Sequence, residues 1–411
     1  MKSLPLTRRE FIRRSSGGLG FLAFSGFAPS FLTQSAMAQT PAPERNRTIL
    51  VIIQLAGGND GLNTIVPYAD DRYYNLRPKL GLKDGLLKLN DQVALNPACN
   101  ELYKLFDSGQ LSVIQNVGYP NPNRSHFRST EIWETAGDGE QMPRTGWLGR
   151  YLDNACSGSP DETPKDGPDA VHVSDLVPQS LLSDTPHDIF GIRARGRTGT
   201  QPGSADEAYE AILQAEHGEG PGSYLQQVMM NTLVTERRVE RIISKYRPST
   251  NYAGNTLAQS LKRVAALIHS DLETRVYFVS QSGYDTHANQ LNNHARLLGE
   301  LSDAMQAFQQ DLNAHGKADQ VLTMTFSEFG RRPAENGSQG TDHGTAAPLF
   351  VMGAKAKGGI IGSAPDLGIG PKEDLKFSTD FRSIYATVLD RWLSADAAAI
   401  LGKQFQPLPF V

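Results

Sequence analysis

The chain has 411 residues, of which 39% are hydrophobic and 20% are charged, and its formal net charge at pH 7 is −4. This length is enough to bury one large core or two smaller ones. The charge gives no basic stripe of the kind that nucleic-acid-binding surfaces need, so we expect no nucleic-acid partner. The two cysteines, Cys99 and Cys156, form no metal-binding motif, and their spacing leaves open whether they pair.

Residues 1–38 have the features of an export signal. The stretch "TRREFIRR" (7–14) is basic and contains the adjacent pair Arg8 and Arg9. A short apolar run follows, and "AMA" (36–38) provides small residues for cleavage. This run is glycine-rich and broken by serine and proline, whereas a membrane-spanning helix needs about 20 apolar residues. We therefore predict export by the twin-arginine translocase to the periplasm or the exterior, with no stable membrane span in the mature chain.

Removal of this signal changes the charge of the protein. It takes away five basic residues and one acidic residue, which leaves 35 basic and 43 acidic residues and a formal charge of −8. Proteins exported by this route fold before they cross the membrane, and many acquire a metal or cofactor first. The signal therefore favours a bound cofactor.

Continuous apolar runs predict buried strands in the mature chain. The first run, Ile49–Leu55, lacks the alternation of a half-exposed strand, as is typical of a parallel sheet covered on both faces. The same pattern recurs at residues 111–118, 170–174, 275–283, 320–330 and 348–353.

Amphipathic helical patterns alternate with these strands. This alternation predicts an α/β fold in which a mostly parallel sheet is sandwiched between helices. We expect residues 39–411 to form a single domain, with residues 187–255 as a helical cap inserted between strands. Two stretches rich in Gly, Pro and Ser, 156–169 and 196–207, are predicted to be surface loops.

Carboxylates and histidines follow several of the predicted strands. In open α/β sheets, ligands bind outside the carboxyl ends of the strands, so these side chains are expected to converge. Clustered Asp, Glu and His without thiols suit zinc, manganese or magnesium. We predict a site for one or two divalent ions, zinc or manganese, with the following ligands: Asp60, Asp285, His287, Glu328, Asp342 and His343.

The stretch "GTDHGTAAP" (340–348) places Asp342 and His343 side by side in a predicted loop. Gly340 and Gly344 are expected to let this loop fold so that both side chains face a metal. Two alternatives remain open: Asp342 orients His343, or both residues face solvent.

Ser125 is the candidate nucleophile. It lies in "NPNRSHFRSTEIW", where Asn and Pro precede a helical pattern. A hydroxyl at a helix N-terminus faces backbone N–H groups that favour an anion. A helix-capping role explains a serine at this position equally well, and Ser129 and Thr130 are alternative hydroxyls.

Several motifs resemble the DUF1501 family of exported bacterial proteins, and the resemblance covers nearly the whole mature chain. The motifs are "LAGGNDGLNTIVPY", "SHFRSTEIWE", "GYDTHANQ", "FSEFGRRPAENGSQGTDHGTAAPLFVMG" and "DFRSIYATVLDRWL". That family in turn is similar to the alkaline phosphatase superfamily, which includes sulfatases. The resemblance implies an alkaline phosphatase-like fold with two metals and a hydroxyl nucleophile.

The resemblance also implies roles for individual residues. Asp60 would ligate the metal nearer the nucleophile Ser125, and Asp285 with His287 would ligate the other metal. His343 resembles the last histidine of the superfamily pattern.

One position departs from that pattern. Where the superfamily has an Asp-His dipeptide, this chain has Ser327 and Glu328, so one histidine is missing. Asp342 is additional and is expected to replace the lost ligand. The cysteine signature of formylglycine sulfatases is absent.

Four arginines lie close in sequence to these residues, and two readings stay open: one of them binds a phosphate or sulfate group through two hydrogen bonds, or they are solvated surface charges, which is the commoner case. They are Arg124, Arg128, Arg331 and Arg332.

Together these features predict an exported metal-dependent hydrolase of phosphate or sulfate esters, acting on a small-molecule or polymer substrate. The alternative is a non-catalytic binding or scaffold protein with a degenerate site, because a fold does not determine a function. A third reading, a polysaccharide-binding protein, predicts exposed aromatic residues near the site, for which Trp133 and Trp147 are the candidates.

Overall fold

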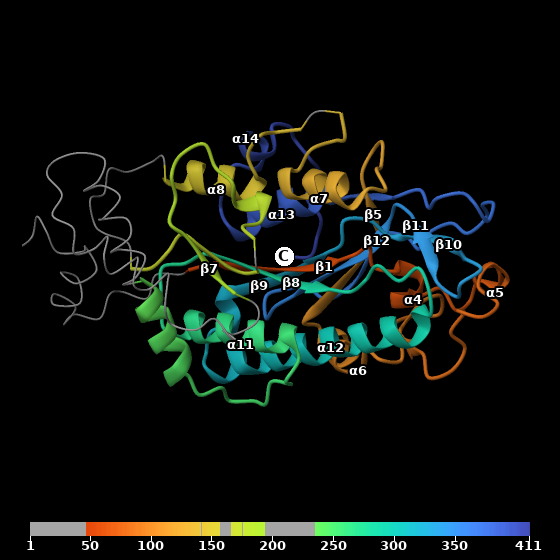
Figure 1. Ribbon diagram of the computed structural model, residues 1–411, viewed down its shortest axis with the longest axis horizontal. Coiled ribbons are helices and arrows are strands. Elements are labelled where there is room, and N and C mark those ends of the chain that lie inside the picture. The colour runs from red at the N-terminus through yellow and green to blue at the C-terminus, as the bar shows by residue number, and fades with distance from the viewer. Residues whose placement is uncertain (1–46, 141, 157–165, 175, 194–234) are drawn as a thin grey trace, which may run out of the picture. The chain divides into compact units, whose positions relative to one another are not determined.

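A computed structural model describes residues 47–140, 142–156, 166–174, 176–193 and 235–411 (Figure 1). The chain separates into two compact units, one formed by Met1–Asn46, Pro160–Asp166 and Gly203–Arg237, and the other by Arg47–Ser159, Gly167–Pro202 and Arg238–Val411. The first unit lies almost entirely outside the described residues, as does the predicted export signal, 1–38. The fold is therefore that of the second unit.

A large sheet forms the centre of this unit (Figure 1). Among the described residues it has nine strands, of which β14 (Thr379–Asp380) pairs with β5 (Leu111–Gly118). The order of the others is β13 (Gly359–Ile361), β5 (Leu111–Gly118), β12 (Ala347–Met352), β9 (Val321–Phe326), β1 (Ile49–Ala56), β8 (Val276–Ser282), β6 (Ala170–Val173) and β7 (Ile189–Ile192).

The six predicted strands are all found in this sheet, as β1, β5, β6, β8, β9 and β12. Their pairings are parallel except those of β12, which runs antiparallel to both β5 and β9. The predicted mostly parallel sheet is confirmed. Because β12 runs the other way, it begins at the edge where its neighbours end, so the residues that precede it lie at the carboxyl ends of the other strands.

Helices cover both faces of the sheet (Figure 1). One face carries α6 (Asn100–Asp107), α11 (Thr256–His269) and α12 (Gln290–Ala314). The other carries α7 (His126–Thr135), α8 (Trp147–Cys156), α13 (Phe381–Thr387) and α14 (Ala397–Leu401). This confirms the predicted sandwich of a sheet between helices.

Strand β1 contributes side chains to two apolar cores, one on each face of the sheet. Successive side chains of a strand point to opposite faces. Leu50 and Ile52 belong to the apolar cluster that includes Trp133 and Trp147 on α7 and α8. Val51 and Ile53 belong to the cluster that contains α11 and α12. An uninterrupted apolar run is therefore required, because both faces are buried.

Smaller elements extend from the carboxyl edge of the sheet. They are α4 (Gly61–Thr64), β2 (Ile65–Val66), α5 (Asp71–Leu76), β3 (Leu87–Lys88), β4 (Ala94–Leu95), β10 (Arg331–Glu335) and β11 (Thr341–His343). Strands β10 and β11 form an antiparallel hairpin. Asp342 and His343 were predicted to lie in a loop, and this prediction is wrong: hairpin pairing makes them the end of β11.

The predicted excursions are only partly described. Of the predicted cap at 187–255, residues 189–192 form the edge strand β7, and residues 194–234 lie outside the described residues. The predicted loop at 196–207 also lies outside them. No helix in the described part of the chain has both the length and the apolar character needed to cross a membrane.

Cys99 is buried and is a free thiol. Burial raises the pKa of this thiol to about 12, so it stays protonated at physiological pH.

Glu134, in the last turn of α7, generates a prediction about stability. Burial raises the pKa of Glu134 from 4.5 to about 7, opposed by hydrogen bonds from the backbone N–H groups of Ser180 and Gln179. The folded state then binds more protons than the unfolded state between these values. Stability should therefore fall by up to about 3 kcal/mol as pH rises from about 4.5 to 7.

We expect Glu134→Gln to remove this decline, so that the variant is more stable than the parent at pH 8 and similar at pH 4.5. Urea unfolding across this pH range measures the difference. Glu131→Gln, one turn earlier and more exposed, is the matched control. A parent whose stability does not decline between pH 4.5 and 7 would contradict the assignment.

Candidate metal centre

His126, Asp285 and His343 converge at the carboxyl edge of the sheet. Each offers one ligand atom, and these atoms all lie within 4.8 Å of one another. His126 is the first residue of α7, Asp285 follows β8, and His343 ends β11. Three separate connections of the fold thus meet at one point, as expected for a site at the carboxyl ends of parallel strands.

His287 belongs to the same cluster. Its Nε2 atom lies 2.9 Å from Nε2 of His343 and 3.0 Å from Oδ1 of Asp285. The same Oδ1 atom lies 3.1 Å from Nε2 of His343. Ligand atoms of a tetrahedral zinc ion, each about 2.0–2.1 Å from the metal, lie roughly 3.3 Å apart. The three atoms are therefore slightly closer together than ligands around one ion, and a small outward movement would let all three bind it.

Hydrogen bonds at Nδ1 orient two of the imidazoles, those of His343 and His126. Nδ1 of His343 donates to the backbone carbonyl of Arg124 at 2.9 Å. Nδ1 of His126 donates to Oε1 of Glu328 at 2.7 Å. In a neutral ring this places the proton on Nδ1 and leaves Nε2 free to bind a metal, which is the usual arrangement of metal-ligating histidines.

The charges of the cluster are mutually supporting. The hydrogen bond with Glu328 raises the pKa of His126. Burial would raise the pKa of Asp285, but a hydrogen bond from the Arg331 guanidinium, the contact with Nε2 of His343 and the charges of Arg331 and His287 lower it to about 2. Asp285 is therefore an ionised acceptor throughout the physiological range, and its side chain is still 49% exposed.

A buried aromatic ring supports the imidazoles. The ring of Phe329 lies 4.9 Å from that of His126 and 4.7 Å from that of His343, measured between centroids. Phe329 is fully buried, so one side of the cluster is apolar and the other is open to solvent.

Glu328 and Asp342, both predicted as ligands, lie behind the imidazoles. Glu328 is buried and accepts hydrogen bonds from His126 and from the backbone N–H of Gly57. Oδ1 of Asp342 lies 3.7 Å from Nδ1 of His287 and accepts a hydrogen bond from Asn336. Glu328 therefore holds His126 in place, whereas Asp342 only lies near His287, at 3.7 Å, and makes no ion pair with its sequence neighbour His343.

Asp60 lies in a different environment from the one predicted. Its fully buried carboxylate accepts hydrogen bonds from both terminal nitrogens of Arg77, at 2.6 and 2.9 Å, and from Gln290. Burial would raise the pKa of Asp60, but the Arg77 guanidinium keeps it below its usual value. Because a guanidinium occupies both oxygens, Asp60 is part of a structural ion pair.

The three candidate hydroxyls differ in their contacts. Ser125 is exposed at the N-cap of α7, and its side chain makes no capping hydrogen bond. It lies between Arg124, whose carbonyl holds His343, and His126. Ser129 is buried and bonded to Tyr119 and to the carbonyl of Glu328, so it is not available. Thr130 is half-buried.

Two of the four arginines remain available to an anion. Arg331 is fully buried, and Arg128 is bonded to Glu131 and Gly139. Arg124 and Arg332 share one carboxylate, that of Asp374, at 3.3 and 3.5 Å. Among the described residues, these two guanidinium groups therefore share a single carboxylate partner.

The glycines around Asp342 and His343 have a steric role. Neither Gly340 nor Gly344 has a positive φ angle. A side chain at Gly340 would collide with the backbone of His287, and one at Gly344 would collide with the backbone of Arg331. The two glycines allow β11 to approach its neighbours closely. Their role is therefore to leave space, and not to bend a loop as predicted.

Trp133 and Trp147 do not form an exposed aromatic groove. Both are buried and stack against Phe381 and Tyr385 in the core. The exposed aromatic residue near the cluster is Phe127, which is 91% exposed in the first turn of α7. The tryptophan-based reading as a polysaccharide-binding protein therefore loses its support.

Sequence reasoning missed His126. The signal was present, because His126 directly follows Ser125 at the predicted helix start after the second strand. In the fold, His126 lies beside Glu328, with which its ring forms a hydrogen bond at 2.7 Å. The donor set thus becomes three imidazoles and one carboxylate, from His126, His287, His343 and Asp285, which suits a single tetrahedral zinc ion.

This arrangement predicts the effect of Glu328→Gln on zinc binding. Removal of a carboxylate that orients a ligating histidine is expected to weaken zinc affinity by about 10–100-fold. Competition with a chromophoric chelator measures it. Glu335→Gln is the matched control, because Glu335 also accepts backbone hydrogen bonds, from Lys79 and Leu80, but lies outside the cluster. Equal zinc affinity in the parent and Glu328→Gln would contradict the prediction.

Comparison with solved structures gives matches at low sequence identity. A protein in the alkaline phosphatase superfamily from Vibrio parahaemolyticus has a TM-score of 0.36 and 9% identity, over 89% of this chain and 68% of that chain. The alkaline phosphatase from the Antarctic bacterium TAB5 has a TM-score of 0.31 and 14% identity, over 77% and 95%. The C-terminal periplasmic domain of EcEptC from Escherichia coli, in complex with zinc, has a TM-score of 0.36 and 8% identity, over 75% and 74%.

A search of curated protein sequences found no match. A family model described as "Protein of unknown function (DUF1501)" matches residues 47–404. The chain therefore belongs to the DUF1501 family, as its motifs predict.

Proposed function

We propose that this protein is an exported, zinc-dependent hydrolase of phosphate or sulfate esters. The observation that carries the proposal is the convergence of three imidazoles and one ionised carboxylate, with two of the imidazoles oriented through Nδ1 by groups behind them. Such preorganisation has a purpose in a metal site, because it aims the free Nε2 atoms at one point. A solvent-exposed cluster needs no such support for stability.

A divalent ion held there would stabilise negative charge on ester oxygens and lower the pKa of a nearby hydroxyl. Zinc matches the donor set better than magnesium, which prefers oxygen ligands. The Asp60–Arg77 pair argues for one ion in place of two, because a buried guanidinium already neutralises the carboxylate that the second ion would need.

Ser125 is the nucleophile in this proposal. Its hydroxyl is exposed, is not used in capping, and lies at the N-terminus of a ten-residue helix, where backbone N–H groups favour an anion. Its oxygen attacks the phosphorus or sulfur atom and the substrate alcohol leaves with a proton. Water then cleaves the serine ester, which releases phosphate or sulfate and restores the hydroxyl.

Arg124 and Arg332 supply the positive charge for the substrate anion. Their single partner, Asp374, holds each of them only weakly, at 3.3 and 3.5 Å. A phosphate or sulfate group offers several oxygens to two guanidinium forks and can bind both. The proposal includes export by the twin-arginine pathway, supported by the sequence pattern of residues 1–38, so that the activity acts in the periplasm or outside the cell.

Paired substitutions test the proposed catalysis. His343→Ala should lose both zinc and turnover, because it removes a ligand. Ser125→Ala should keep its zinc and lose turnover by at least about a thousandfold, because only the nucleophile is gone. Elemental analysis of the mature protein, purified without chelator, gives the zinc content. Hydrolysis of 4-nitrophenyl phosphate and 4-nitrophenyl sulfate gives the turnover.

His269→Ala is the control, since His269 is an exposed histidine at the last residue of α11. Unchanged turnover in Ser125→Ala would refute the nucleophile. A folded parent protein that contains no metal and takes none up would refute the hydrolase and favour the scaffold alternative.

Substitution of Arg124 tests the anion site. Loss of one charge-assisted hydrogen bond is expected to lower kcat/KM by roughly 10–100-fold. We expect Arg124→Ala to show this loss with its zinc content unchanged, and Arg128→Ala, whose guanidinium is engaged elsewhere, to behave like the parent. Steady-state kinetics at constant ionic strength separate the two, and equal values for both variants would exclude a specific role for Arg124.

A further inference from the structure

The backbones of Arg124 and Arg332 lie against the strand that carries His343. Nδ1 of His343 donates to the carbonyl of Arg124 at 2.9 Å. Strand β10, which contains Arg332, pairs with β11, and a Cβ atom at Gly344 would lie only 2.7 Å from the backbone nitrogen of Arg332. Contacts between separate segments of the chain therefore place the backbones of both arginines next to a ligand of the proposed ion.

The side chains of these arginines converge on the carboxylate of Asp374. Nη1 of Arg124 lies 3.3 Å from Oδ2, and Nε of Arg332 lies 3.5 Å from Oδ1. Both distances exceed the roughly 2.7–2.9 Å of a charge-assisted hydrogen bond. Nε of Arg332 and Oδ1 of Asp374 are buried and make no hydrogen bond. A guanidinium offers several N–H donors, so both arginines keep donors for the oxygens of a ligand.

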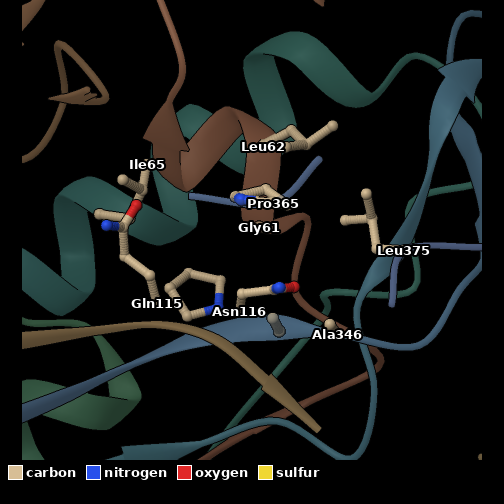
Figure 2. Close-up of a pocket in the computed structure, with 10 residues that line it drawn as sticks. Gly61, Leu62, Ile65, Gln115, Asn116, Ala346, Pro365 and Leu375 are labelled. Carbon is tan, nitrogen blue, oxygen red and sulfur yellow. The ribbon is translucent and has the colours of Figure 1, made fainter. Parts of the chain in front are cut away.

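The chain around Asp374 is anchored to the body of the fold. The next residue, Leu375, is buried, and its carbonyl accepts a hydrogen bond from Oγ1 of Thr345. Its side chain lines a small cavity together with Leu62 and Ala346 (Figure 2). The backbone of Asp374 is therefore fixed beside the arginines, so its carboxylate stays close to any anion that they bind.

The charges of this group set a limit on its ligand. Two guanidinium cations and one carboxylate sum to a net charge of +1 for Arg124, Arg332 and Asp374. They can therefore neutralise one negative charge. A second negative charge would face the carboxylate of Asp374 and remain unpaired, which is unfavourable for a group removed from water. The proposed zinc ion attracts every anion, so the repulsive carboxylate is the element that discriminates between anions.

Esters of sulfate and phosphate differ in charge more than in shape. A sulfate monoester and a phosphate diester each carry one negative charge. A phosphate monoester carries close to two above neutral pH, because its second pKa is about 6. All three have a tetrahedral central atom of similar size. Charge is therefore the property by which the arginine pair can separate them.

We infer that this anion site selects esters with one negative charge, sulfate monoesters or phosphate diesters, and that Asp374 sets this selection by repelling the second charge of a phosphate monoester. The inference narrows the proposed function and rests on it for the fate of the ester. The charge preference itself depends only on Arg124, Arg332 and Asp374.

Analogues that resist hydrolysis test the preference without any turnover. Phenylphosphonate is a dianion in mildly alkaline solution, whereas benzenesulfonate has the same ring and one negative charge. Isothermal titration calorimetry of the mature protein at constant ionic strength gives both dissociation constants. We expect the parent to bind benzenesulfonate at least about tenfold more tightly, because only the dianion meets an unpaired repulsion.

A third analogue separates charge from the central atom. Methyl phenylphosphonate contains phosphorus and carries one negative charge. We expect its affinity to lie closer to that of benzenesulfonate than to that of phenylphosphonate. Whichever of the two monoanions binds more tightly identifies the source of the charge, a sulfate monoester or a phosphate diester.

Substitutions locate the preference. Asp374→Asn removes the charge and keeps the shape of the side chain, and it should shift the ratio of the two affinities towards phenylphosphonate by at least about tenfold. Asp374→Ser should shift it in the same direction. Glu373→Gln removes a charge from the preceding residue, which is exposed, and is the matched control with an unchanged ratio.

Three outcomes overturn the inference. They are a parent that binds none of the analogues, a methyl phenylphosphonate affinity as weak as that of phenylphosphonate, and a ratio that Asp374→Asn leaves unchanged. Equal weakening of both ligands in Asp374→Asn belongs to the last case, and would show that Asp374 only holds the arginines. A protein without zinc or turnover that still shows the preference would refute only the proposed function. An active zinc hydrolase whose preference does not depend on Asp374 would refute only this inference.

Discussion

The metal centre depends on one buried cation, the guanidinium of Arg331. It donates to the carbonyls of Gly57, Gly58, Tyr284 and Thr341, and to Oδ1 of Asp285 at 2.8 Å. These groups belong to the connections that follow β1 and β8 and to strand β11. A fully buried charge must be compensated by such bonds, and loss of one partner from a buried pair typically costs about 3–5 kcal/mol. Arg331 therefore ties together the ends of the paired strands β1 and β8 and the hairpin strand β11, and it also keeps Asp285 ionised.

Close packing around this cation explains the glycines of the site. Gly57 has a φ angle of 122°, and a side chain there would collide with the backbone at Asp285. Gly58 has a φ angle of 78°, and a side chain there would collide with the ring of Phe329. Gly340 and Gly344 meet similar limits against His287 and Arg331. The close approach of the histidines thus depends partly on these glycines, although none of them offers a side chain to a ligand.

The sequence predicted the parts of this arrangement that depend on local pattern. Apolar runs buried on both faces located the six central strands, and polar residues after those strands located Asp285, His287 and His343. The direction of β12 could not be predicted, because an apolar run has no polarity. Glu328 and Asp60 were assigned as ligands because position after a strand does not show which partner a carboxylate meets. In the fold, the partner of Glu328 is His126 on α7, and the partner of Asp60 is Arg77, the C-cap residue of α5.

The partner of Asp60 also bears on how many ions the site holds. Arg77 is fully buried and bonded to Asp60, to Asn63 and to the backbone carbonyls of Arg332 and Pro333. A metal ion that bound Asp60 would have to displace this buried guanidinium, which would leave the side-chain oxygen of Asn63 and the backbone carbonyls of Arg332 and Pro333 without this donor. The permanent positive charge of Arg77 thus lies at the end of β1, next to Asp60. An ion that exchanges with solvent would bind at the exposed cluster around Asp285. This difference in burial separates Asp60 from the candidate ligands around Asp285 and supports the proposal of a single ion with a fixed cation behind it.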